Sequence, residues 1–120
     1  MNVPHQGRYD LYLEKANLAD KIIADLWHWV QTTPGYANNT SFIITTDHGR
    51  GRKNKWVSHN EFIKGSSQTW MALIGPGIMP LGEVKETNQL YQQQLAQCIA
   101  HLLGEDFIIR SDHDNPVTVF

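Results

Sequence analysis

The sequence predicts an α/β fold, and three observations support this class. A long segment has the apolar periodicity of a helix, two short segments have the composition of strands, and a second helical segment follows them. The expected order is helix, strand, loop, strand, helix, an alternation typical of α/β domains. Two strands are too few for a sheet with both faces covered. We therefore expect residues 1–120 to be a single partial domain of a larger protein or assembly; a small two-layer domain that covers itself is the alternative.

The first helix is predicted from Tyr9 to about Thr32, and Pro34-Gly35 ends it. At about 100° per residue, its apolar side chains form two adjoining stripes that span roughly half of the circumference, which is broad for a surface helix. The stripes consist of Leu11, Leu18, Ile22, Leu26 and Trp29, and of Tyr12, Ala16, Ala19, Ile23 and Val30. Such a helix requires a large sheet or several helices to cover it.

Two strands are predicted after this helix. Residues 41–46 (SFIITT) form a short, continuous, β-branched run, which indicates a buried strand of a parallel sheet and not an alternating surface strand. Residues 68–74 (QTWMALI) form the second predicted strand, and Gly75-Pro76-Gly77 ends it.

A second helix and a tail complete the predicted domain. Thr87 or Asn88 can cap a helix that runs to Leu103. The tail comprises residues 105–120, and a short strand is expected at 107–109.

Composition and charge exclude several classes of protein. A hydrophobic content of 41% and a charged content of 18% exclude wholesale disorder. The net charge of −2 predicts no general attraction to nucleic acid. No apolar run approaches the roughly 18 residues of a membrane span. Cys98 is the single cysteine, so no internal disulfide framework is expected. The first residues carry no signal-peptide pattern, and the compartment stays open.

Asp47-His48-Gly49 directly follows the first predicted strand. Ligand sites of open α/β sheets lie beyond the carboxyl ends of the strands, and adjacent carboxylate and imidazole groups suit zinc or manganese. The alternative is that Asp47 caps a turn while His48 is merely exposed.

Two further histidines lie in loops at the ends of elements. His59 follows His48 by a loop, and His5 precedes the first helix. Each is unremarkable alone, but with Asp47 and His48 they form a set that can converge on a metal. The other histidines, His28, His101 and His113, are not assigned to the site.

Arg50 lies between two glycines beside the expected metal ligands. It belongs to a basic stretch with Arg52, Lys53 and Lys55, which can attract an anionic ester. A solvated loop is the alternative, above all for the two lysines. No aromatic residues alternate with these basic ones, so we expect no single-stranded nucleic acid as a partner.

Several motifs together resemble one family. TTDHGRG, then Trp56 and His59, then WMALIGPGI and YQQQLAQCIAHLLG are similar to the C-terminal part of the alkaline phosphatase superfamily, over about Val3 to Gly104. The superfamily includes phosphomonoesterases, sulfatases, nucleotide phosphodiesterases and cofactor-independent phosphoglycerate mutases. The resemblance implies a sandwich in which helices flank a mostly parallel sheet.

The resemblance also implies a two-metal site, with zinc the expected ion and manganese a second possibility. Asp47 and His48 match the ligands of one metal, and His59 and His5 match ligands of the other. Arg50 is then expected to bind an anionic phosphate or sulfate ester. The D-x-x-x-H pattern of the family has its aspartate four residues before His5, where this chain has Met1.

The family's nucleophile lies upstream of the matching region, so no catalytic nucleophile is assigned here. We therefore expect the C-terminal fragment of a metal-dependent ester hydrolase, inactive alone. The alternative is a non-catalytic, self-associating module that binds a metal or a partner. A homo-oligomer or a missing N-terminal half would cover the apolar surface of the partial domain.

Overall fold

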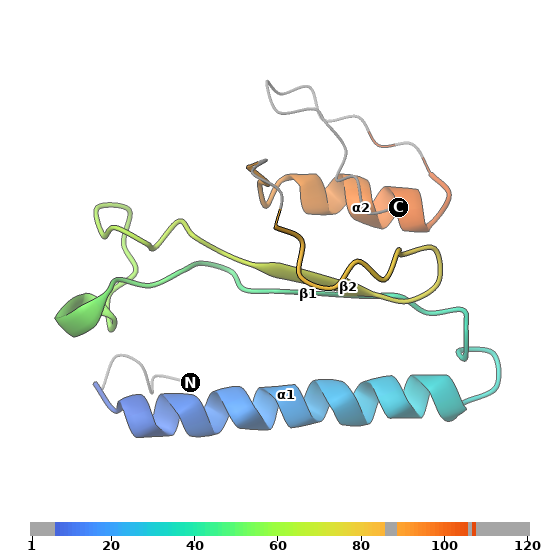
Figure 1. Ribbon diagram of the computed structural model, residues 1–120, viewed down its shortest axis with the longest axis horizontal. Coiled ribbons are helices and arrows are strands. Elements are labelled where there is room, and N and C mark those ends of the chain that lie inside the picture. Colours follow the sequence, from blue (N-terminus) through green and yellow to red (C-terminus); the bar gives the residue numbers. More distant parts are fainter. Residues whose placement is uncertain (1–6, 86–88, 106, 108–120) are drawn as a thin grey trace.

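The computed structural model describes residues 7–85, 89–105 and 107. Helix α1 comes first, then strand β1, a short 3-10 turn η2, strand β2 and helix α2. Their bounds are Tyr9–Thr32, Phe42–Thr45, Lys53–Lys55, Met71–Ile74 and Gln94–Leu102. Figure 1 shows α1 on one side of the strand pair and α2 on the other. The predicted class, a mix of helices and strands in this order, is confirmed.

Helix α1 has the bounds that the periodicity predicts. Thr33 is already extended, with φ −99° and ψ 121°, because a residue before proline disfavours helical angles. Its hydroxyl donates to the carbonyl oxygen of Trp29 at 2.7 Å, which satisfies one of the orphaned acceptors of the last turn. At the other end, hydrogen bonds from the Arg8 guanidinium lower the pKa of Asp10 to about 2.

The strand pair covers only part of the apolar surface of α1. The rings of Trp27 and Phe42 meet edge-on at 5.1 Å, and Val30 is buried. One stripe stays open to solvent, with exposed fractions from 45% to 56%. Its members are Leu18, Ile22, Leu26 and Trp29. Val30 and Cys98 are the buried hydrophobic residues of the described part of the chain. The strand pair and α2 therefore do not cover the apolar stripe of α1, as the sequence predicts for a partial domain.

The two strands pair antiparallel, with Phe42 opposite Ile74 and Thr45 opposite Met71. The expectation of a buried strand in a parallel sheet does not describe this pair. Residues 46–70 leave β1 and enter β2 at the same end of the ladder, and a connection that returns to the end it left imposes antiparallel pairing. The residues of β1 are half-buried or exposed. Both strands are also shorter than the predicted segments.

Helix α2 begins later than predicted. The side chain of Gln94 accepts the backbone N–H of Tyr91 at 2.6 Å, so the first turn forms here. The caps expected at residues 87 and 88 lie outside the described residues, as do residues 108–109 of the predicted tail strand.

The predicted end of α2 at Gly104 is confirmed. Its φ is 74°, and Glu105 donates to the carbonyl of Ala100 at 2.9 Å, as in a Schellman motif. None of the described helices has the length and apolar character to cross a membrane.

Candidate metal centre

The loop after β1 is held by backbone hydrogen bonds that only glycine permits. Gly49 donates to the carbonyl of Ser66 at 2.7 Å, and Gly51 donates to that of Ser58 at 3.0 Å. A Cβ on Gly49 would collide with the carbonyl oxygens of Gln68 and Gly65, and one on Gly51 with that of Lys55. The glycines of this motif therefore allow the loop to fold against residues 55–68 at close range.

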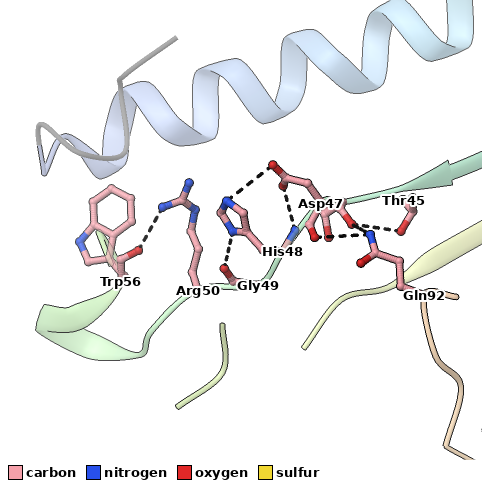
Figure 2. Close-up of polar contacts among 8 residues, drawn as sticks. Thr45, Asp47, His48, Gly49, Arg50, Trp56 and Gln92 are labelled. Atoms are coloured by element: carbon pink, nitrogen blue, oxygen red, sulfur yellow. Dashed lines mark hydrogen bonds and ion pairs between the residues drawn. The ribbon is translucent and has the colours of Figure 1, made fainter. Parts of the chain in front are cut away.

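A side chain from a distant segment ties down the start of the loop. The amide of Gln92, just before α2, donates to the carbonyl oxygens of Thr46 and Asp47 at 3.1 and 3.4 Å (Figure 2). The sequence analysis did not single out Gln92. No local signal could have found it, because the contact joins residues that are 45 and 46 positions apart.

Asp47 and His48 lie as a pair with one fixed orientation. His48 Nδ1 is 2.8 Å from the carbonyl oxygen of Gly49, so Nδ1 carries the proton and donates it. The other ring nitrogen, Nε2, faces Asp47 Oδ2 at 3.6 Å. In the neutral imidazole, Nε2 then carries the lone pair that a metal needs. The Asp47 side chain is largely exposed, and the His48 side chain is 32% exposed.

This separation fits a shared cation. Two ligand atoms at about 2.1 Å from a tetrahedral zinc lie about 3.4 Å apart, close to the observed 3.6 Å. The same geometry serves as an ion pair when His48 is protonated, so the pair is compatible with both states. Asp47 Oδ1 accepts the backbone N–H of His48 at 2.9 Å, which leaves Oδ2 to face the imidazole.

The structure brings His59 to His48. Their rings are stacked, with centroids 4.1 Å apart and planes 11° from parallel. Lone pairs lie in the ring planes, so two parallel rings do not aim at a single ion. If a nitrogen of each ring faced the same side, each ring would bind its own ion, at a spacing of about 4 Å that resembles two-metal sites.

The described residues supply only part of a complete ligand set. Within residues 7–85, 89–105 and 107, no group of three or more acidic, histidine or cysteine side chains is arranged to hold a metal. Zinc in catalytic sites normally has about three protein ligands. His5 lies outside the described residues, and so does His113. His28 and His101 are exposed on their helices.

Arg50 projects to the same side of the loop as His48 (Figure 2). Its guanidinium donates to the carbonyl oxygen of Trp56 at 3.5 Å and lies 5.9 Å from the ring centre of Tyr12. The anion-binding role of Arg50 stays a prediction, and its guanidinium lies beside the histidines. Arg52, Lys53 and Lys55 are exposed, as the alternative of a solvated loop requires.

An aromatic cluster that the sequence analysis missed anchors the loop to α1. The ring of Trp56 meets those of Tyr9 and Tyr12 at 5.3 and 5.7 Å. The spacing of Tyr9 and Tyr12 on one helix face was a usable signal, but their partner in the loop is more than 40 residues away. This cluster places the loop that carries Asp47 and His48 beside the first turns of the helix.

Comparisons of the chain with family models, curated proteins and solved structures find no match. The resemblance to the alkaline phosphatase superfamily therefore rests on the sequence motifs, and the function is argued from the site itself.

Proposed function

We propose that this chain carries part of a two-cation site in a metal-dependent phosphate- or sulfate-ester hydrolase of the alkaline phosphatase superfamily. Asp47 and His48 bind one divalent cation, zinc in the first place, and His59 contributes to the second. The observation that carries the proposal is the 3.6 Å separation of Asp47 Oδ2 and His48 Nε2. The stacked ring of His59 beside them supports a second ion at the spacing of two-metal sites.

The fold is compatible with the C-terminal part of a helix-flanked, mostly parallel sheet. Helices lie on both sides of the strand pair (Figure 1), and large parallel sheets commonly include an antiparallel strand at one edge. The half-covered stripe of α1 supports the proposal that structure beyond a single copy of residues 1–120 covers it.

Each residue has a defined task in this proposal. The hydrogen bond from His48 Nδ1–H to the carbonyl oxygen of Gly49 makes Nε2 the nitrogen available to a cation, and Asp47 adds the negative charge that retains it. Arg50 binds an oxygen of the anionic ester by a charge-assisted hydrogen bond. When bound, the two cations polarise the ester and stabilise the leaving oxygen.

The nucleophile is assigned to a part of the enzyme outside the described residues. The hydroxyl of Thr45 donates to the carbonyl oxygen of Trp70 at 2.7 Å, and that of Ser66 donates to that of Asn60 at the same distance. These two hydroxyls near the loop serve its structure. This observation favours the second candidate function, a non-catalytic module that binds a metal or a partner and associates with itself.

Metal titration of the purified chain tests the proposal. We expect zinc and manganese to bind, and we expect His48→Ala or Asp47→Asn to weaken zinc binding at least about tenfold, because even the loss of a residue that only orients a ligand costs about 10–100-fold. His28→Ala is the matched control, because His28 is exposed on α1. Zinc affinity that is unchanged in His48→Ala would contradict the proposed site.

Hydrolysis of an aryl phosphate and an aryl sulfate separates the two candidate functions. Turnover that needs both added metal and His48 supports the hydrolase. Metal binding without turnover, in the chain and in any longer form that contains it, supports the non-catalytic module.

A further inference from the structure

Strand β1 has one unpaired edge beside an apolar groove. In the part of the chain that the structure describes, β1 pairs only with β2, so its second edge presents free backbone N–H and C=O groups. The groove has a volume of about 530 Å³. It is lined by Ile23 and Leu26 of α1 and by residues 41–45. An unpaired edge next to apolar side chains is the surface on which an additional strand pairs.

The exposed stripe of α1 continues from the same groove. At about 100° per residue, Leu26, Ile22, Trp29 and Leu18 follow one another within about 80° of the helix circumference. Leu26 lines the groove, and the other three are 45% to 56% exposed. The open edge of the sheet and the open stripe of the helix therefore form one continuous surface.

The part of this surface from Leu26 to β1 is uncharged, whereas Lys15 and Asp25 lie in or beside the α1 stripe. Residues 26–46, from the end of the stripe through β1, contain no Asp, Glu, Lys or Arg, although charged residues make up 18% of the sequence. The strand also lacks the lysines and prolines with which edge strands avoid pairing with copies of themselves. A second copy of β1 thus meets no electrostatic repulsion there.

We infer that a second copy of this chain covers the surface, with β1 of each copy paired antiparallel about a two-fold axis. Such an axis stands perpendicular to the sheet, so the α1 helices of both copies lie on the same face of it. The α1 helices of the two copies then lie side by side under a four-stranded sheet and bury each other's stripe. Four residues of strand edge are too few for the roughly 800 Å² per partner of a stable interface, so the helix stripe is an essential part of it.

Sedimentation velocity over a concentration series tests the helix contribution. We expect the wild-type chain to shift from monomer to dimer as its concentration rises, and Leu26→Glu to raise the dissociation constant at least about tenfold, since a buried unpaired charge is costly. Leu13→Glu is the matched control. Leu13 is 46% exposed and Leu26 is 49% exposed, but the two lie about 140° apart on the helix. Circular dichroism checks that both variants remain helical.

Hydrogen exchange tests the strand pairing. The amides of β1 that do not pair with β2 should become protected only at concentrations at which the dimer forms. A monomer at every concentration would overturn the inference and point to a strand of another polypeptide as the occupant. A dimer that tolerates Leu26→Glu, or one whose β1 edge still exchanges freely, would overturn it as well. His48→Ala should dimerise like the wild type, so this result is independent of the proposed metal site.

Discussion

The imidazole rings of His48 and His59 lie nearly parallel, with centroids 4.1 Å apart. Parallel rings favour two separate ions over one shared ion, because the lone pairs of the two rings do not converge. We therefore expect about two zinc ions per chain at saturation and about one in His59→Ala. Equilibrium dialysis with metal analysis measures this stoichiometry. His28→Ala should keep the wild-type value. A wild-type chain that binds a single ion, lost in both His48→Ala and His59→Ala, would show that the rings share it.

Gly51 is a position where a side chain does not fit. A Cβ there would meet the carbonyl oxygen of Lys55 and, at 2.7 Å, the Cγ2 atom of Ile63. We expect Gly51→Ala to destabilise the chain by about 2 kcal/mol or more, the usual range for overpacking, and to weaken metal binding. Urea unfolding measures the free energy.

Gly77 provides the control for this steric effect. It has a positive φ of 79° but open space around its Cβ position, so Gly77→Ala costs only the left-handed backbone penalty of about 1–2 kcal/mol and leaves metal affinity unchanged. Equal loss of metal affinity in both variants would contradict the role of Gly51.

Trp56 couples the loop after β1 to helix α1 through its ring contacts with Tyr9 and Tyr12. Aromatic pairs contribute about 0.5–1.5 kcal/mol each beyond their buried area, so Trp56→Ala should cost about 1–3 kcal/mol in thermal or urea unfolding. It should also weaken zinc binding, since the loop loses its anchor. Trp70→Ala, at a side chain 56% exposed, should have a smaller effect on both. The reverse order would show that the cluster does not position the loop.

Cys98 is predicted to be an unreactive thiol in the folded chain. Its relative exposure is 1%, and burial raises its pKa above the ordinary value of 9.0. Alkylation at pH 8 should therefore be much slower in the folded protein than in denaturant, because the reacting species is the thiolate. Rapid labelling of the native chain at the rate of the denatured chain would contradict the burial of this residue.

The raised pKa of Cys98 also determines how the stability of the fold depends on pH. The Cys98 thiol ionises at a lower pH in the unfolded chain than in the folded chain. Its contribution to the stability of the fold is therefore complete below pH 9 and is lost as the pH rises through the pKa of the thiol in the folded chain. Urea unfolding at neutral and strongly alkaline pH should show the difference, and Cys98→Ala should lack it.

Local sequence patterns predicted the elements that depend on neighbouring residues. The apolar period and Pro34 determined α1 because helical hydrogen bonds join residues four positions apart. Gly104 marked the end of α2 because only its backbone adopts the left-handed angle of that cap at low cost. The start of α2 was predicted too early, since the helix begins at Gln94, whose side chain accepts the backbone N–H of Tyr91.

The tertiary structure decided what the local patterns left open. The direction of β2 relative to β1 depends on the path of residues 46–70, and no residue in the strands encodes it. Asp47 and His48 are neighbours in the chain, so their pairing could be expected. The stacking of His59 on His48, the Trp56 cluster and the contact of Gln92 required the folded loop, because they join residues whose separation in sequence carries no information about their distance in space.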